Sequence, residues 1–206
     1  MSKPAELQST VFVVDDDEAV RDSLGLLIDS VGLEFETFAS AQEFLEAYDP
    51  GRPGCLVLDI RMPGMSGLEL QRRLGEIGAI LPIIFITGHG DVPVAVRAMR
   101  EGAVDFLQKP FEDQDLLDRI QQSLERDAVH RRELAERQGI LERIAGLTPR
   151  EREVMDLVAA GLANKNAASR LGVSQRTVEI HRARVMEKMG ATSLAHLVRM
   201  AMTVGK

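Results

Sequence analysis

The residues with the clearest chemical potential in this sequence are carboxylates, a hydroxyl and an ammonium that follow short apolar runs. They are Asp15, Asp16, Asp59, Thr87 and Lys109. If the runs are parallel strands, their carboxyl ends meet at one edge of a sheet, where such folds bind ligands. Carboxylates gathered there raise one another's pKa unless a cation compensates their charge. The pattern therefore predicts an acidic site that holds a cation.

The predicted cation is Mg²⁺, because oxygen ligands and water suit a hard divalent ion. The set contains no His or Cys, which argues against zinc, thiol or triad chemistry. A carboxylate, a metal ion and a lysine together favour phosphoryl transfer, in which Asp59 attacks phosphorus while Lys109 and Thr87 stabilise charge on the phosphoryl oxygens. The expected product is an aspartyl phosphate, although each residue alone could belong to an ordinary turn.

The elements that must position these residues alternate between strand and helix patterns over the first 125 residues. Four of the five apolar runs are almost uninterrupted, as in parallel strands covered on both faces. The predicted strands are 11–14, 33–38, 55–58, 83–86 and 104–107, and the predicted helices are 18–30, 40–48, 67–76, 92–101 and 112–124. This order predicts a doubly wound α/β domain.

The remainder of the sequence has helical patterns only. Charged residues dominate 125–145, which predicts a helical linker with a possible break at Gly139. Thr148, Pro149 and Glu151 have the spacing of a capping box, so a helix is expected to begin there and to end near residue 160. Further helices are predicted at 164–171, with Asn164 as a cap, at 175–189 and at 193–202. A basic helix after a short Gly-containing turn is the helix-turn-helix pattern.

Composition and charge set the limits of these interpretations. The chain of 206 residues is 45% apolar and 28% charged, with one Cys, as expected of a globular protein that buries a core. Its first ten residues lack an apolar signal segment, and its longest charge-free apolar stretch is about half of the roughly 20 residues that a membrane span needs. We therefore expect a cytoplasmic protein with no membrane partner, and Cys55 as a buried, unreactive thiol.

Charge is divided unevenly along the chain. Residues 1–125 hold 10 Lys and Arg against 23 Asp and Glu, a net charge of −13, whereas residues 126–206 hold 15 against 9, a net charge of +6. An acidic half followed by a basic half suggests partners of opposite charge, with nucleic acid as the candidate for the second. Two ordinary solvated surfaces that happen to differ would give the same numbers.

The helix at 175–189 divides into two faces. Val178, Val185 and Met189 share one side and are predicted to face a core, with His181 half-buried at its border. The other side is predicted to enter a major groove of DNA, where Arg176 could read guanine and Glu179 cytosine. Phosphate contacts are predicted for the flanking residues Thr177, Arg184 and Lys188 and for Lys165. The predicted contact residues are Lys165, Arg176, Thr177, Glu179, Ile180, Ala183, Arg184 and Lys188.

The segments VVDDD (13–17), LDIRMPGMSG (58–67), ITG (86–88) and FLQKPF (106–111) resemble the receiver domain of two-component response regulators, over about 10–124. The resemblance implies a flavodoxin-like fold with strand order 2-1-3-4-5. It implies that Asp59 is the phosphoacceptor, that Asp15, Asp16, Asp59 and the backbone carbonyl of Arg61 hold Mg²⁺, and that Thr87 and Lys109 contact the phosphoryl group. Phe106 stands with Thr87 at the switch positions, without the hydroxyl of the commoner Tyr.

The segments LTPRE (147–151), GLANK (161–165) and SQRTVEIH (174–181) resemble the LuxR-type helix-turn-helix, and the end SLAHLVRMA (193–201) adds to a similarity with FixJ-type response regulators. The domains are then a receiver at 10–124, a helical linker at 125–145 and a DNA-binding domain at 146–206. The resemblance implies a phosphorylation-dependent transcriptional regulator rather than an enzyme, with self-phosphotransfer and autodephosphorylation at Asp59 only. The implied partners are a sensor histidine kinase, duplex promoter DNA, RNA polymerase and a second copy of the chain.

Dimerisation is expected on phosphorylation, through the face of the fourth helix and fifth strand at about 92–106. Two other classes of function remain open from the residues alone. One is a stand-alone aspartyl-phosphate phosphatase or phosphotransferase, which would need a general acid and a substrate lid that the sequence does not offer. The other is a signalling module whose helical domain binds protein or RNA.

Overall fold

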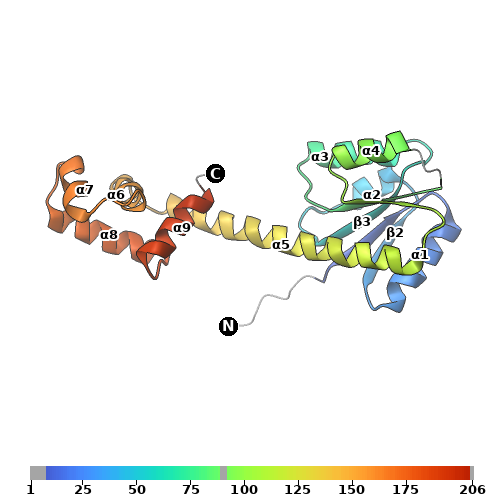
Figure 1. Ribbon diagram of the computed structural model, residues 1–206, viewed down its shortest axis with the longest axis horizontal. Coiled ribbons are helices and arrows are strands. Elements are labelled where there is room, and N and C mark those ends of the chain that lie inside the picture. The colour runs from blue at the N-terminus through green and yellow to red at the C-terminus, as the bar shows by residue number, and fades with distance from the viewer. Residues whose placement is uncertain (1–7, 89–91, 205–206) are drawn as a thin grey trace. The chain divides into compact units, whose positions relative to one another are not determined.

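The computed structural model describes residues 8–88 and 92–204 (Figure 1). The chain divides into two compact units, one up to Arg131 and one from Arg132 onward. Within the described parts of the chain, no helix combines the length and the apolar character that a membrane span requires.

The first unit contains a five-stranded parallel sheet. Its strands are β1 (Thr10–Val14), β2 (Glu34–Phe38), β3 (Gly54–Asp59), β4 (Ile83–Thr87) and β5 (Asp105–Gln108). They lie in the order β2-β1-β3-β4-β5, which confirms the predicted flavodoxin-like topology. Val14 pairs with Leu58, and Thr87 pairs with Gln108. Asp15, Asp59, Thr87 and Lys109 therefore lie at the same edge of the sheet.

Helices cover both faces of this sheet (Figure 1). They are α1 (Glu18–Ser30), α2 (Ala41–Ala47), α3 (Gly67–Glu76), α4 (Val92–Arg100) and α5 (Asp113–Ala145). Side chains of α2, α3 and α4 pack with one face in a core that includes Phe44, Leu70 and Ala98, whereas those of α1 and α5 pack with the other face, through Ile28 and Ile120. The strands are buried on both sides, which explains their continuous apolar runs.

Side-chain caps begin three of these helices. Asp17 caps α1, Ser40 caps α2 and Ser66 caps α3, each by accepting a hydrogen bond from a backbone N–H of the first turn. At the start of α3, a Cβ on Gly67 would lie 2.2 Å from the carbonyl oxygen of Asp59. Only glycine allows the backbone of α3 to approach the end of β3 so closely.

Helix α5 runs unbroken through Gly139, so the predicted break there is wrong. One glycine costs a helix only about 1 kcal/mol relative to alanine. Ile140 and Ile144, which follow it, are buried in the core of the second unit. Their packing offsets the unfavourable propensity of the single glycine.

Two charged residues of α5 fasten it to the first unit. The buried carboxylate of Asp127 accepts hydrogen bonds from Gly54 N at 3.0 Å and from Arg131 Nε at 2.7 Å. Arg131 also donates to the carbonyl oxygens of Pro50 and Arg52, at 2.9 and 2.7 Å. These contacts lie at the amino-terminal end of β3, and they explain why the first unit extends to Arg131.

The second unit is helical, as predicted. It contains α6 (Pro149–Ala159), α7 (Asn164–Leu171), α8 (Gln175–Met189) and α9 (Leu194–Val204). Thr148 and Glu151 form the predicted capping box, and Gly172 ends α7 in the left-handed conformation at φ 66°. The cap predicted at Asn164 is wrong, because α7 is preceded by Ala163 without a side-chain cap. The Asn164 side chain instead accepts a hydrogen bond from Arg182 on α8, at 2.9 Å.

Candidate phosphorylation site and DNA-facing helix

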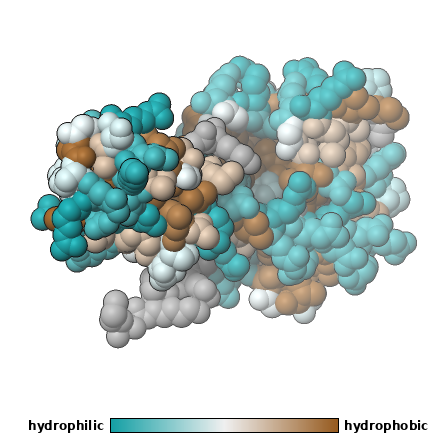
Figure 2. Space-filling model, turned by 60° about the vertical axis from the view of Figure 1, so that its left-hand side comes forward, coloured by the Kyte–Doolittle hydropathy of each residue, from teal (hydrophilic) through white to brown (hydrophobic). Residues whose placement is uncertain are grey.

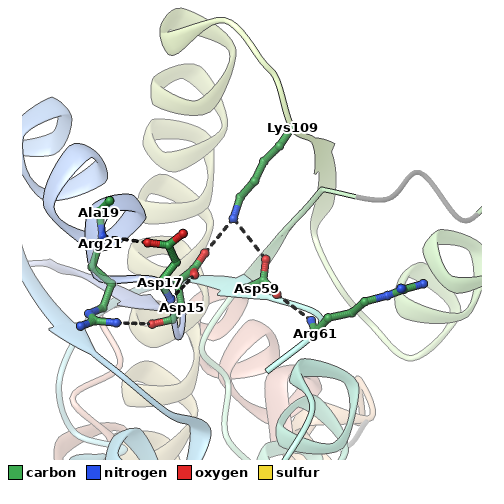
Figure 3. A network of polar contacts seen from close by, with 7 residues as sticks. All are labelled: Asp15, Asp17, Ala19, Arg21, Asp59, Arg61 and Lys109. Carbon is green, nitrogen blue, oxygen red and sulfur yellow. Dashed lines mark hydrogen bonds and ion pairs between the residues drawn. The ribbon is translucent and has the colours of Figure 1, made fainter. Parts of the chain in front are cut away.

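The first candidate site lies at the carboxyl edge of the sheet and is centred on Lys109 (Figure 3). Its Nζ donates hydrogen bonds to Asp15 Oδ2 at 2.8 Å and to Asp59 Oδ1 at 3.2 Å. The other oxygen of Asp59, Oδ2, accepts a hydrogen bond from Arg61 N at 2.6 Å. Both carboxylates are buried. Three residues from the ends of β1, β3 and β5 thus form one polar group.

Burial and charge act in opposite directions on this group. Desolvation raises the pKa of Asp59 above its ordinary value, although the Arg61 N–H and the charge of Lys109 partly oppose the shift. Burial alone would lower the pKa of Lys109, but the hydrogen bonds and charges of Asp15 and Asp59 raise it overall. Lys109 therefore stays protonated, and Asp59 is a more basic carboxylate than one in water.

Thr87 lies beside this group at the end of β4 and is buried. Its carbonyl oxygen accepts a hydrogen bond from Lys109 N at 2.7 Å, which fixes the residue after β5 against the end of β4. Phe106, on β5, is half-buried and packs against the core beneath α2, α3 and α4. The two predicted switch residues thus lie on neighbouring strands.

Asp16 and Asp17 differ from Asp15, which lies inside the site. Asp16 is exposed. Asp17 belongs to the helix start, because its Oδ1 accepts the N–H of Ala19 at 2.9 Å. In Figure 3, Asp17 contacts Ala19 rather than Lys109.

The donor set at this edge fits a hard divalent cation. Among the residues that the structure describes, no three His, Cys, Asp or Glu side chains are grouped closely enough to hold a metal ion. However, Asp15 and Asp59 already converge on one positive charge, the ammonium of Lys109. Two carboxylates with water and a backbone carbonyl form the oxygen ligand set that Mg²⁺ prefers. The residues therefore fit Mg²⁺ once the ammonium is displaced from between them.

The second candidate site is the outer face of α8. Val178, Val185 and Met189 are buried in the core of the second unit, which confirms the predicted inner face. Arg176, with 82% of its side chain exposed, and Ile180, at 45%, point away from that core. Figure 2 shows hydrophilic side chains over most of the visible face of this unit, with apolar ones between them.

The other residues of the predicted DNA-facing set differ in how free they are. Lys165, Ala183 and Arg184 are exposed, and Thr177 is half-exposed. Glu179 is held by its neighbours, because Gln175 Nε2 donates to its Oε1 at 3.1 Å and Arg176 Nη1 lies 3.8 Å from its Oε2. His181 is half-buried, and its buried Nδ1 has no hydrogen-bond partner in the described part of the chain.

Lys188 is engaged inside the domain, which the sequence did not reveal. Its Nζ donates to Glu151 Oε2 at 2.7 Å, and the same oxygen accepts the N–H of Thr148 at 2.9 Å. The hydrogen bond from Lys188 and the one from Thr148 lower the pKa of Glu151 from 4.5 to about 2. Thr148 and Glu151 were readable as a capping box, but the partner of Glu151 lies 37 residues further along the chain.

Sequence analysis also missed two arginines. Arg21 on α1 donates from Nη1 to the carbonyl oxygen of Asp15 at 2.8 Å (Figure 3). Arg131 joins α5 to the loop before β3, as described above. The contacts that join these arginines to other segments end on backbone carbonyls, which the sequence does not mark. The pairing of Arg131 with Asp127, at i,i+4 on one helix, is the one signal that the sequence could offer. From sequence alone, a charged residue near the start of a helix or in a linker is expected to be solvent-exposed.

Comparison with protein families assigns both units. Residues 11–121 match the model of the response regulator receiver domain. Residues 145–201 match the model of the bacterial regulatory proteins of the luxR family. A receiver with a buried acidic site, joined to a helix-turn-helix domain, defines a response regulator that acts on transcription.

Relatives match nearly the whole chain. Nodulation protein W of Bradyrhizobium diazoefficiens is 51% identical over 98% of this chain and 88% of its own length. The transcriptional regulatory protein FixJ of Azorhizobium caulinodans is 51% identical over 95% of this chain and 92% of its own. The solved structure of the response regulator StyR is 49% identical, with a TM-score of 0.87 over 95% of this chain and 98% of that one. The chain belongs to the FixJ-type response regulators and is a phosphorylation-dependent transcriptional regulator.

Proposed function

We propose that Asp59 accepts a phosphoryl group from a sensor histidine kinase and that the aspartyl phosphate controls binding of the second unit to promoter DNA. The observation that supports Asp59 is its place in a buried group with Lys109 and Asp15, at the end of the central strand. A kinase partner and DNA binding follow from the response-regulator family; the particular residues are our proposal.

The chemistry assigns a separate task to each residue. Asp59 Oδ1 faces Lys109 and is the nucleophile, while the Arg61 N–H holds Oδ2 and fixes the plane of the carboxylate. The bond from phosphorus to the kinase histidine breaks as the bond to Asp59 forms. Lys109 then moves from the carboxylates to a phosphoryl oxygen, where its positive charge is better compensated, and the Thr87 hydroxyl donates to another.

Mg²⁺ would be held by Asp15, Asp16, Asp59 and the backbone carbonyl of Arg61, and it would neutralise charge on the phosphoryl oxygens. Without a compensating cation, a phosphoryl group would add negative charge beside Asp15 and Asp16. The protein catalyses only this self-phosphotransfer and the later hydrolysis of its own aspartyl phosphate. When Asp59 is phosphorylated, Thr87 and Phe106 rearrange, and this conformational change alters the surface formed by α4 and β5.

The surface at 92–106 is proposed to mediate dimerisation of the phosphorylated receiver. On α4, three apolar side chains that a monomer leaves exposed are Val92, Val96 and Met99, at 71%, 44% and 44%. A homodimer that covers them buries apolar surface, and it brings two copies of α8 to paired half-sites on DNA.

On DNA, we assign base contacts to Arg176, Glu179, Ile180 and Ala183, and phosphate contacts to Lys165, Thr177 and Arg184. Arg176 suits guanine, and Glu179, which only accepts hydrogen bonds, suits cytosine. Lys188 can contact a phosphate only by leaving or sharing its bond to Glu151. The receiver is taken as 10–124, the linker as 125–145 and the DNA-binding domain as 146–206, acting in the cytoplasm with RNA polymerase as a further partner.

Sedimentation velocity and promoter binding, each with and without a small phosphodonor and Mg²⁺, test this function. We expect a mostly monomeric chain that dimerises on phosphorylation and then binds duplex DNA about tenfold or more tightly, which corresponds to a coupling energy of about 1.4 kcal/mol or more. A tight dimer with the same DNA affinity in both states would contradict the dimerisation switch. Labelling of Asp59 that persists in excess chelator would contradict the proposed role of Mg²⁺.

A further inference from the structure

Arg21 reaches out of α1 to the loop that carries the acidic residues. Its Nη1 donates a hydrogen bond to the carbonyl oxygen of Asp15 at 2.8 Å, as Figure 3 shows. The side chain is partly buried, so this contact is shielded from water on one side. A guanidinium is always protonated in proteins, so the donor is present at every physiological pH.

Two other hydrogen bonds of this loop join residues that are close in sequence. Asp17 N donates to Asp15 Oδ1 at 3.0 Å, and Ala19 N donates to Asp17 Oδ1 at 2.9 Å. Each of these bonds joins residues two apart, so each moves with the loop. The backbone N–H of Asp15 is tied to β2, through Phe38 O at 3.3 Å. Arg21 is the contact that ties the carbonyl side of Asp15 to the body of a helix.

The position of the charge matters as much as the hydrogen bond. Asp15, Asp16 and Asp59 carry like charges that repel one another at this edge. Lys109 compensates the negative charges of Asp15 and Asp59 by pairing directly with their carboxylate oxygens. Arg21 places its positive charge at the backbone carbonyl of Asp15. It therefore does not occupy the space between the side-chain carboxylates of Asp15 and Asp59.

We propose that Arg21 is a positioning residue for the divalent cation: by holding the carbonyl of Asp15 against α1, it keeps Asp15 and Asp16 in the orientation that receives Mg²⁺. This inference rests on the proposed function of the acidic edge. Arg21 touches neither the phosphoryl group nor the cation, and it acts through the loop. Groups that orient metal ligands in this way commonly affect affinity strongly.

The test measures Mn²⁺ binding to the full chain by electron paramagnetic resonance, with the metal alone as the probe. Arg21→Met keeps the aliphatic stem and removes both donor and charge. Its Kd for Mn²⁺ is expected to rise about tenfold, at the low end of the effect of such supporting contacts. Arg21→Lys keeps the positive charge but has one donor nitrogen in place of the planar guanidinium, so its Kd is expected to fall between those of the wild type and Arg21→Met. Arg72→Met, at an exposed position of α3, is the matched control and should bind as the wild type does.

A second readout separates positioning from chemistry and from folding. With a small phosphodonor, Arg21→Met should need about tenfold more Mg²⁺ for half-maximal labelling, while the maximal rate at saturating Mg²⁺ stays close to that of the wild type. Unchanged Mn²⁺ affinity with a lower melting temperature would overturn the proposal and leave Arg21 a purely structural role. Tighter Mn²⁺ binding would also overturn it, because repulsion by the guanidinium would then dominate. A wild-type chain that binds no Mn²⁺ would refute the metal site itself, and this inference with it.

Discussion

The proposed phosphorylation site draws its side chains from strands far apart in the sequence, whereas the proposed DNA-facing surface belongs mainly to one helix. Lys109 bonds Asp15 and Asp59 across 94 and 50 residues, and these carboxylates are buried. On α8, the contacts of Glu179 come from Gln175 and Arg176, within one turn, and Arg176 is exposed. The first site is therefore a product of the whole fold, and the second is a set of nearly independent side chains on a supporting core.

This difference determines how each region should respond to substitution. Buried groups that share hydrogen bonds are strongly coupled, so that removing one changes the task of the others. Exposed side chains that meet separate bases or phosphates contribute almost additively. We expect loss of function to be all-or-none at the carboxyl edge of the sheet and graded on α8.

The largest effect is expected at Asp59. Asp59→Asn should abolish labelling by a phosphodonor, because it removes the nucleophile while it keeps the size of the side chain and one acceptor oxygen. The fold should persist, since burial already raises the pKa of Asp59 and a neutral amide avoids the cost of desolvating a charge. A phosphate-affinity gel measures the labelling, and circular dichroism checks the fold. Labelling equal to that of the wild type would mean that another residue is the acceptor.

The ion pair of Arg131 with Asp127, which fastens α5 to the first unit, tests whether buried polar groups are strongly coupled. Arg131→Ala should lower the free energy of unfolding of the first unit by about 3 kcal/mol, because it leaves the buried carboxylate of Asp127 without its ion-pair partner. Tyr48 is the one tyrosine in a chain without tryptophan and lies in this unit, so its fluorescence in urea follows this transition alone. Arg132→Ala, one residue further at an exposed position, is the control. Equal midpoints for the two variants would show that Arg131 does not anchor the helix.

On α8, two arginines should fail in different ways. Arg176→Ala should cost roughly 1 to 3 kcal/mol of binding and relax the preference at one base pair, whereas Arg184→Ala should weaken all sequences alike and reduce the salt slope by about one. The two lie eight residues apart, about 12 Å along a helix, so the double variant should be additive to within about 0.5 kcal/mol. Titrations of matched and mismatched duplexes at several salt concentrations measure these effects. Identical salt slopes and base preferences for the two variants would refute the assignment of the face.

The pair between Lys188 and Glu151 is an exception on the helical side, because it joins α8 to the buried carboxylate of Glu151 on α6. Since the pKa of Glu151 is about 2 in the folded state against 4.5 ordinarily, its contribution to stability is present above about pH 4.5 and is lost as the pH falls towards 2. Glu151→Gln should therefore melt earlier than the wild type near neutral pH, and the difference should vanish in acid. A difference that does not change with pH would indicate that packing, rather than the ion pair, supports α6.

The acidic edge was largely predictable because it depends on strand order and on where each strand ends. Alternating apolar runs and helical patterns place Asp15, Asp59, Thr87 and Lys109 at one edge before any coordinate is known. The end of α7 at the left-handed Gly172 and the start of α8 at the Ser174 cap were equally accessible, since left-handed glycines and caps act within a few residues.

Contacts between distant polar groups outside that edge were not predictable. The partner of Glu151 and the backbone targets of Arg21 and Arg131 depend on which side chains the tertiary fold brings within about 3 Å. The break predicted at Gly139 was wrong for the opposite reason, because local propensity was weighed without the packing of Ile140 and Ile144. Spacing rules describe one element at a time, whereas these contacts join two.

The smallest effect is expected from glycine substitutions in the second unit, which test backbone conformational preference where no packing contact changes. A Cβ on Gly139 meets nothing within 4 Å, so Gly139→Ala should stabilise the second unit by about 0.8 to 1 kcal/mol through helix propensity alone. Gly172 is equally uncrowded, but its φ of +66° disfavours any Cβ, so Gly172→Ala should destabilise the same unit by roughly 1 kcal/mol. Thermal unfolding followed by far-ultraviolet circular dichroism should shift in opposite directions for the two variants. A shift in the same direction would mean that α5 around residue 139 is held by something other than its own backbone preference.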